Sequence, residues 1–195
     1  MELLLSAATP HAGLAPSPWV LRWTAALPPG ARVLDLACGH GRHLRALAAR
    51  GLQPVGVDRD AAAIDALRGT PGAAGVELCV ADLEAGPWPW PGRVFDAGVV
   101  TNYLWRPLWP TLLASLAPGG RLVHETFAVG NETVGKPSNP DFLLRPGELL
   151  EVARDGGLRV LGYEDGFLDH PPRFVQRIAA VREQPGGAPT RHPLG

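Results

Sequence analysis

Short hydrophobic runs and helix-spaced apolar positions alternate along the first two thirds of the chain. Apolar runs bounded by Gly, Pro or Asp are typical of buried strands, and apolar residues three or four positions apart are typical of amphipathic helices. The alternation begins with a predicted strand over 31–38 and a predicted helix over 41–51. The same criteria predict further strands at 53–58, 76–82, 95–102 and 121–127, and further helices at 19–27, 61–69 and 108–120.

The pattern changes after the strand at 121–127. The long segment 128–144 has no clear periodicity, and a predicted helix over 145–157 follows it. Two predicted strands, 158–166 and 173–183, then flank a short loop, which favours an antiparallel pair because a parallel pair needs a longer crossover. Irregular loops of this length are usually functional or disordered, so we expect segment 128–144 to act as a lid over a binding site.

Strands that alternate with helices form a parallel sheet with right-handed crossovers. The sequence therefore predicts an α/β fold, a Rossmann-like, doubly wound, seven-stranded and mostly parallel sheet with an antiparallel C-terminal hairpin. We divide the chain into an N-terminal arm and short helix (1–29), the α/β domain (30–183) and a tail (184–195) that we expect to be disordered.

Composition narrows the partners and the location of this chain. The 195 residues are 46% hydrophobic and 19% charged, with a net charge of −1, so a broad basic field for a nucleic acid is absent and a nucleic-acid partner is disfavoured. The sequence has no apolar run of membrane-spanning length and no basic region of a secretory signal at its start. Cys38 and Cys79 lack metal-ligand spacing, so we expect a cytoplasmic protein without a metal; the sequence predicts no oligomeric state.

A glycine-rich turn follows the first predicted strand, in the sequence VLDLACGHGRH at 33–43. Glycine at this place lets the backbone approach a ligand closely, and the next helix offers free N–H groups. The dinucleotide fingerprint G-x-G-x-x-G is incomplete here, because Gly39 and Gly41 are present but Leu44 occupies the third position. The glycines therefore predict a ligand site and leave the ligand open.

Three aspartates recur one strand–helix unit apart. Asp35 lies in the first strand, and Asp58 and Asp82 end the second and third strands. The carboxyl ends of neighbouring parallel strands form the edge of the sheet where such folds bind ligands. Asp58 suits the two hydroxyls of a ribose, Asp82 with the Leu83 N–H suits an adenine, and Asp35 suits a cationic amino group. A ligand with these three parts fits the acids better than a dinucleotide does.

These motifs together resemble those of the class I S-adenosylmethionine-dependent methyltransferases. LDLACGHGRH is similar to the first motif of that family, with Ala37 at its first small position, Asp58 matches the acid after the second strand, and ADL at 81–83 matches the adenine motif. The resemblance covers about residues 30–183 and includes the terminal hairpin. It implies S-adenosylmethionine as the cofactor and methyl transfer by in-line displacement.

A second resemblance narrows the substrate class. HETF, followed by GNETVGKPSNPDFLLRPGELLE, is similar to small bacterial methyltransferases of the tellurite-resistance type. That resemblance implies a small-molecule acceptor, such as a thiol or a chalcogen compound. Methylation of DNA adenine or of glutamine is disfavoured, because the Asn-Pro-Pro-aromatic motif of such enzymes follows the fourth strand, whereas SNPDF at 138–142 follows the fifth.

The motifs and the resemblance define a set of candidate site residues. We expect cofactor contacts at the strand ends and the turns after them: Asp35, Ala37, Cys38, Gly39, Gly41, Asp58, Arg59, Asp82, Leu83 and Asn102. We expect substrate contacts from Tyr103, Arg106 and Asn139, with Arg106 or Arg145 on an anionic group, and the other charges of 145–155 on a solvated helix face.

A protic nucleophile needs a base, whereas a soft chalcogen nucleophile needs none. Tyr103 and Glu125 are the candidate catalytic residues, and His124 is a further candidate base. His124 and Glu125 point to opposite faces of their strand, so only one of them is expected to face the pocket.

Two other functions share these motifs. A non-catalytic protein that binds S-adenosylmethionine as a regulatory subunit would keep the same glycines and acids, because they serve binding rather than turnover. A nicotinamide-dependent oxidoreductase would share the first glycines, although the missing third glycine and the extra acids argue against it. Binding of NAD without binding of S-adenosylmethionine would favour the oxidoreductase.

Overall fold

The computed structural model describes residues 15–184, 186 and 191–192. Its α-helices are α1 (Pro18–Thr24), α2 (Arg42–Ala48), α3 (Ala61–Arg68), α4 (Trp109–Ala114) and α5 (Glu148–Asp155). Its strands are β1 (Arg32–Leu36), β2 (Gln53–Asp58), β3 (Glu77–Val80), β4 (Phe95–Thr101), β5 (Leu116–Phe127), β6 (Arg159–Asp169) and β7 (Pro172–Val181). The predicted disorder of the tail falls mostly outside the described residues, as does most of the predicted N-terminal arm.

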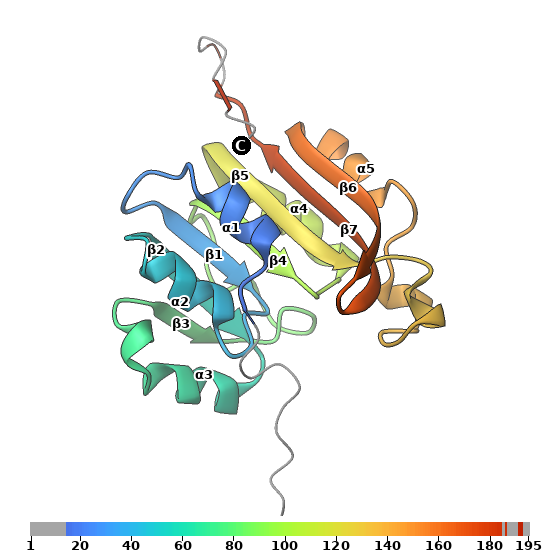
Figure 1. Cartoon of the computed structure of the whole chain (residues 1–195). Coiled ribbons are helices and arrows are strands. Elements are labelled where there is room, and N and C mark those ends of the chain that lie inside the picture. The colour runs from blue at the N-terminus through green and yellow to red at the C-terminus, as the bar shows by residue number, and fades with distance from the viewer. Residues whose placement is uncertain (1–14, 185, 187–190, 193–195) are drawn as a thin grey trace, which may run out of the picture.

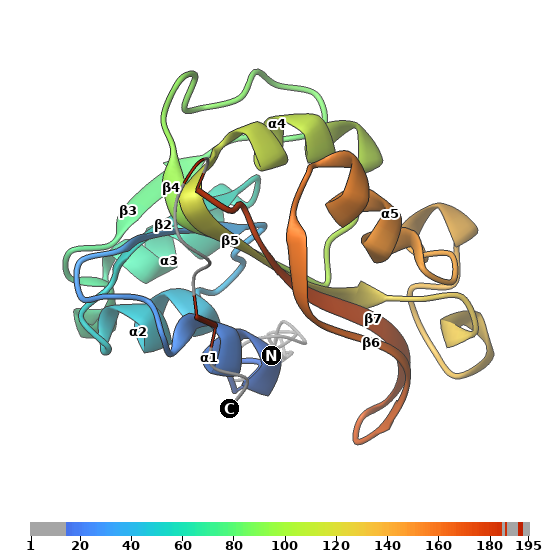
Figure 2. The same ribbon diagram turned by 90° about the horizontal axis from the view of Figure 1, so that it is seen from above.

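The strands form one sheet in the order β3-β2-β1-β4-β5-β7-β6. The pairs β1–β2, β1–β4, β2–β3 and β4–β5 are parallel, whereas β5–β7 and β6–β7 are antiparallel. Helices α1, α2 and α3 cover one face of the sheet, and α4 and α5 cover the other (Figures 1 and 2). The predicted doubly wound fold with its antiparallel hairpin is confirmed.

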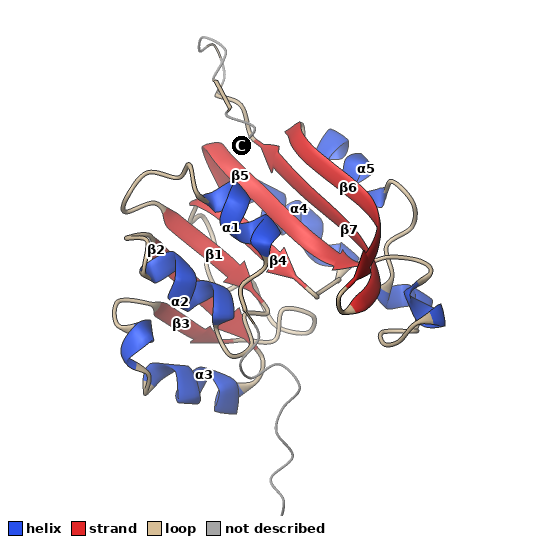
Figure 3. Ribbon diagram, in the orientation of Figure 1, coloured by secondary structure: helices blue, strands red, loops and turns tan. Residues whose placement is uncertain are grey.

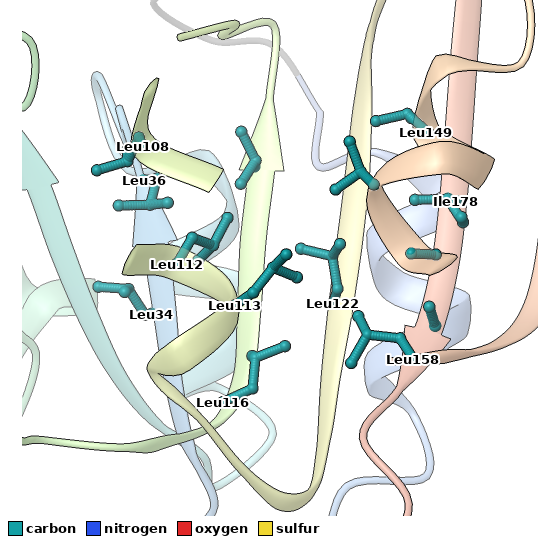
Figure 4. Packing of buried hydrophobic residues seen from close by; sticks show 14 of the residues in the cluster. Leu34, Leu36, Leu108, Leu112, Leu113, Leu116, Leu122, Leu149, Leu158 and Ile178 are labelled. Atoms are coloured by element: carbon teal, nitrogen blue, oxygen red, sulfur yellow. The ribbon is translucent and has the colours of Figure 1, made fainter. Parts of the chain in front are cut away.

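The hydrophobic core has a layer on each face of the sheet. Figure 4 shows the larger layer, where side chains of α4 and α5 pack on the strands. Its fully buried members include Leu34, Leu112, Leu122, Leu149 and Ile178. The layer on the other face packs Trp19, Val20 and Trp23 of α1 and Leu47 of α2 against the sheet, which joins the N-terminal helix to the core.

The boundary between α4 and β5 differs from the prediction. The predicted helix over 108–120 ends at Ala114, and β5 begins at Leu116, which pairs with Phe95. Leu116 is only 2% exposed, so its side chain is part of the core at the point where the helix was expected to continue. Pro118 has no N–H for a helical hydrogen bond, and Gly119 has a φ of 82°. The residues from Leu116 onward therefore belong to β5 and do not extend α4.

Segment 128–144 connects β5 to α5 and contains two short helical turns (Figure 3). Its two ends are joined, because Val129 N–H donates to Leu144 O at 2.9 Å and Leu144 N–H donates to Phe127 O at 2.9 Å. Asn131 is 1% exposed, and its side chain donates to Pro137 O and accepts from Phe174 N–H. These bonds hold the two ends of the segment together and tie its middle to β7.

Candidate functional site

A pocket of about 610 Å³ lies at the carboxyl ends of the five parallel strands. This is the edge at which open α/β sheets bind ligands. The strand-end and loop residues that line it are Ala37, Asp58, Arg59, Ala81, Asp82, Leu83, Glu84, Asn102, Tyr103, Leu104, Thr126, Phe127, Lys136, Pro137 and Phe142. The topology therefore brings together most of the cofactor residues predicted from sequence and adds a second wall from β5 and segment 128–144.

A neighbouring pocket of about 430 Å³ continues this site along the glycine turn. Ala37, Asp58, Arg59 and Asn102 line both pockets, so the two form adjacent parts of one site. The remaining residues of the smaller pocket are Cys38, Gly39, His40, Arg42, His43, Arg45 and Thr101. The sequence analysis missed Arg42 and Arg45, which lie on the α2 side of this pocket.

Asp58 organises the turn between the two pockets. Its Oδ2 accepts the Gly39 N–H at 2.7 Å, and its Oδ1 accepts the Asp60 N–H at 2.9 Å. Ala37 and Gly39 both have a φ of 51°, and a Cβ on Gly39 would meet no atom within 4 Å. A non-glycine residue in this region of φ is strained, and such strain is found where structure or function over-determines the backbone.

The second glycine of the turn has a packing role. Gly41 precedes α2 with a φ of 68°, and a Cβ there would collide with the side chain of Leu67. It lines neither pocket. Leu44, where a dinucleotide site has its third glycine, packs instead against Gly56 of β2, whose missing Cβ makes the room. Helix α2 therefore still packs closely on β2, because the glycine that makes room lies on the strand and not on the helix.

Asp82 and Leu83 lie on the wall of the larger pocket, after β3. Asp82 Oδ1 accepts the N–H groups of Glu84 and Ala85 at 2.8 and 3.2 Å. These two bonds hold the pKa of the carboxyl below its usual value, chiefly through Glu84, so the group is an anion at neutral pH. A carboxylate oxygen in this place can accept a hydrogen bond from an exocyclic amine.

Asp35 lies beneath the glycine turn and does not line either pocket. It is 0% exposed, and neither carboxyl oxygen has a hydrogen-bond partner among the described residues. Burial raises the pKa of this carboxyl to about 8. His43 Nδ1 is 3.8 Å from Asp35 Oδ2, too far for a good hydrogen bond, and His43 Nε2 accepts the Ser17 N–H at 3.1 Å.

His43, near the start of α2, is itself buried and lines the smaller pocket. Because Nε2 accepts a hydrogen bond, the proton of the neutral ring is on Nδ1 and faces Asp35. Burial lowers the pKa of His43 to about 3, so the ring is neutral in the folded protein. A protonated Asp35 beside a neutral His43 is the charge state that burial favours.

This charge state predicts how stability depends on pH. Asp35 binds its proton more tightly in the folded state, so between the ordinary pKa of 3.8 and about 8 its contribution to stability falls as pH rises. The contribution of His43 is complete above its ordinary pKa of 6.5 and is lost only below it. From pH 6.5 to about 8, unfolding free energy should therefore fall by up to about 1.4 kcal/mol per pH unit, and Asp35→Asn should remove this slope. Urea denaturation of both proteins measures it, and parallel pH dependences would contradict the assignment.

Asn102 and Tyr103 follow β4 at the centre of the site. Asn102 has a φ of 54° and donates its N–H to Glu125 O at 3.0 Å. The Tyr103 side chain lines the larger pocket, and its hydroxyl is buried without a hydrogen-bond partner among the described residues. Burial, with the nearby acids Glu84 and Asp82, raises the pKa of Tyr103. The phenol therefore stays protonated, which suits a hydrogen-bond donor and not the predicted base.

The other candidate bases lie outside both pockets. Glu125 is buried on the α1 side of the sheet, accepts the Ser17 hydroxyl at 3.1 Å and lies 3.5 Å from Arg173 and from Arg177. This ion pairing gives Glu125 a structural role in place of the predicted catalytic one. His124 is also buried, its Nε2 lies 3.2 Å from Tyr103 O, and burial lowers its pKa to about 4. The β5 residues that line the larger pocket are Thr126 and Phe127.

Arg106 does not face the predicted substrate. Its guanidinium donates to both carboxylate oxygens of Glu148, at 2.7 and 3.0 Å, and to the carbonyls of Asp141 and Leu143. Glu148, predicted on a solvated helix face, is only 2% exposed. Burial alone would raise the pKa of Glu148, but hydrogen bonds, first from Arg106, lower it overall. The pair ties segment 128–144 to α5.

Two further predicted substrate contacts also lie outside the larger pocket. Asn139 is exposed, and its side-chain oxygen accepts the Asp141 N–H at 3.0 Å, which closes a helical turn. Arg145 is exposed and lies 3.4 Å from Glu148, in a surface groove between α4 and α5. The segment instead contributes Lys136, Pro137 and Phe142 to the pocket. One sequence signal was overlooked: Lys136 is the only lysine of the chain.

Part of the chain matches known proteins in sequence. Residues 33–120 match the family model described as a methyltransferase domain. A protein-L-isoaspartate O-methyltransferase of Methylorubrum extorquens (strain PA1) is 36% identical over 111 residues, which are 56% of this chain and 47% of that protein. The chain thus spans about half the length of the curated relative it matches.

Two solved structures share the fold. TehB from Haemophilus influenzae superposes with a TM-score of 0.73 at 20% identity, over 89% of this chain and 64% of that one. A TehB-like S-adenosylmethionine-dependent methyltransferase from Corynebacterium glutamicum ATCC 13032 Kitasato superposes with a TM-score of 0.62 at 23% identity, over 88% of this chain and 91% of that one. At these identities the likeness establishes the fold. Within the described residues, no helix is long and apolar enough to cross a membrane.

Proposed function

We propose that this chain, in which residues 33–120 match a methyltransferase domain, is a class I S-adenosylmethionine-dependent methyltransferase that transfers a methyl group to a small-molecule acceptor. The observation that carries the proposal is Asp58, fixed by two backbone N–H groups at the wall shared by both pockets. A carboxylate in this place can accept both hydroxyls of a ribose. The two halves of a nucleoside-linked amino acid can then lie on either side of it.

The residues of the site fit this cofactor. Gly39 leaves open space beside the smaller pocket, so the backbone of the turn can approach a ligand closely. Asp35 is fully buried and lines neither pocket, so it is not placed to contact an ammonium group directly, as the sequence predicted. Asp82 and Leu83 line the opposite end, where an adenine would find an acceptor. The remaining cofactor contacts proposed from the sequence are those of Ala37, Cys38, Arg59 and Asn102, all of which line at least one pocket.

Methyl transfer requires little of the protein beyond the positioning of the two reactants. S-adenosylmethionine supplies a methyl group on a positively charged sulfur, which departs as a neutral thioether. The chain's own part is to hold the acceptor in line and to exclude water. Leu104, Phe127, Pro137 and Phe142 form an apolar wall for this purpose. Tyr103, with its unpartnered hydroxyl, can donate a hydrogen bond that orients either reactant.

The test begins with binding. Protein stripped of bound ligand is titrated calorimetrically with S-adenosylmethionine, S-adenosylhomocysteine and NAD. We expect the two sulfur compounds to bind and NAD not to bind, and the reverse would favour an oxidoreductase. Formation of S-adenosylhomocysteine is then followed with a panel of thiols and chalcogen oxyanions. Binding without turnover across a broad acceptor panel would favour the non-catalytic regulatory protein.

Tyr103→Phe separates the roles of donor and base. Loss of one neutral hydrogen bond is expected to lower turnover by about 10-fold, with S-adenosylhomocysteine affinity unchanged. Because the pKa of Tyr103 is raised, its hydroxyl is protonated throughout the working range, so the pH–rate profile of the variant should keep the shape of the original. If the alkaline or acidic limb of the profile disappears in the variant, Tyr103 transfers a proton and the donor role is wrong.

A further inference from the structure

The larger pocket has two chemically different halves. The half formed after β2 and β3 carries the ionisable groups Asp58, Arg59, Asp82 and Glu84. The half formed by β5 and segment 128–144 is lined by Thr126, Phe127, Lys136, Pro137 and Phe142, and Lys136 is its one ionisable side chain among the described residues. If the first half holds the nucleoside, as the proposed function requires, the second half receives the acceptor.

This acceptor half is built in advance of any ligand. Asn131 holds the Pro137 carbonyl, and Arg106 holds the carbonyls of Asp141 and Leu143 on either side of Phe142. The Phe142 side chain is 46% exposed and lines the pocket beside Pro137 and Phe127. Exposed apolar surface that lines a pocket is typical of a wall that a ligand covers.

Lys136 is the charged member of this wall. It is exposed, and it makes no hydrogen bond or ion pair with any described residue. Of the residues that the structure describes, neither a carboxylate nor an imidazole lines this half of the pocket, and the nearest sequence candidates, His124 and Glu125, are buried elsewhere. The wall therefore offers an acceptor a cation and apolar contacts, and it offers no base.

We infer that the acceptor is a small aromatic or similarly apolar molecule that reacts as an anion, with Lys136 as its cationic contact. This inference rests on the proposed function and specifies its substrate class. The anion's lone pair forms the new bond to the methyl carbon while the carbon–sulfur bond breaks and its electron pair stays on sulfur. No proton is released in this step, so the absence of a base is no obstacle. Thiolates, selenolates and carboxylates meet this requirement, whereas alcohols and ammonium groups do not.

Binding tests the charge preference without knowledge of the true acceptor. Benzoate and benzamide share a planar apolar body and differ in charge, and each is titrated into the protein saturated with S-adenosylhomocysteine, with ligand-observed NMR as the readout. We expect benzoate to bind more tightly, Lys136→Met to lower benzoate affinity by about 10-fold, and Lys136→Arg to keep it. Ser138→Ala is the matched control, an exposed neighbour that does not line the pocket. Equal affinity of the wild-type protein for the two ligands, or equal benzoate affinity in Lys136→Met, would overturn the inference.

Turnover supplies a second and separate readout. With two aromatic thiols of well-separated thiol pKa, kcat/KM should rise with pH at the pKa of whichever thiol is used, because the acceptor ionises itself. A limb at one pH for both thiols would reveal a protein base and overturn the inference. Failure of S-adenosylhomocysteine to bind would instead refute the proposed function, while the benzoate titration of the free protein would still report on Lys136.

Discussion

Replacing Asp58 with alanine is expected to weaken the binding of S-adenosylhomocysteine by about 100-fold, the largest effect on binding of any single change in the site. The carboxylate has two tasks that the variant loses together. It is positioned to accept ribose hydroxyls, and each hydrogen bond to a charged group contributes about 1.5–3 kcal/mol. It also holds the Gly39 N–H at 2.7 Å and so keeps the turn at a φ of 51° in place before any ligand arrives.

Asp58→Asn separates these two tasks. Its amide oxygen can still accept the Gly39 N–H, which is the bond that holds the glycine turn. The amide NH2 cannot accept the Asp60 N–H, and the negative charge is gone. We expect a loss of about 10-fold for asparagine against about 100-fold for alanine, measured by calorimetry. Asp65→Ala is a matched control, since Asp65 is an exposed acid on α3 that lines neither pocket. Affinity within a factor of about two of wild type for Asp58→Ala would contradict the ribose assignment.

The cofactor half of the site could be anticipated from sequence because its signals are local. Each predicted acid follows or lies in an apolar run, and parallel topology brings the ends of such runs to one edge. Asp58, Asp82 and the turn at Gly39 lie at that edge, as the spacing predicts. Asp35 is the exception. Asp35 lies in β1, paired with Gly56 of β2 on one side and with Val99 of β4 on the other, and its side chain has no contact with solvent.

The acceptor half could not be anticipated in the same way, because its residues are chosen by long-range contacts. The alternation of side chains along β5 predicts that His124 and Glu125 point to opposite faces of the sheet. It does not predict that His124 contacts the Tyr103 carbonyl, or that Ser17 and two arginines contact Glu125. Only the last two residues of β5, Thr126 and Phe127, line the pocket. An arginine after β4 looks equally suitable for a substrate or for a buried acid, and only the packing of α5 decides between them.

Arg106→Ala is expected to lower the unfolding free energy by about 3 kcal/mol, a large effect for a partly exposed residue. The variant removes both short hydrogen bonds from Arg106 to the Glu148 carboxylate, which is 2% exposed, and leaves it only the longer contact with Arg145 and the Arg145 N–H. It also frees the carbonyls of Asp141 and Leu143. For a protein of this length that loss corresponds to a fall of about 6–12 °C in Tm. Differential scanning calorimetry at neutral pH measures it.

The double variant Arg106→Met, Glu148→Leu shows whether the unpaired acid is the cause. Replacing both charges with apolar groups of similar size removes the buried carboxylate, so most of the lost Tm should return. The methionine that replaces Arg106 has no N–H to hold the carbonyls on either side of Phe142, so the double variant does not restore the pocket wall. Benzoate binding is therefore expected to stay weaker than in the wild type even where the Tm returns. A normal Tm in Arg106→Ala together with lost turnover would show the opposite, that Arg106 leaves Glu148 and contacts the acceptor.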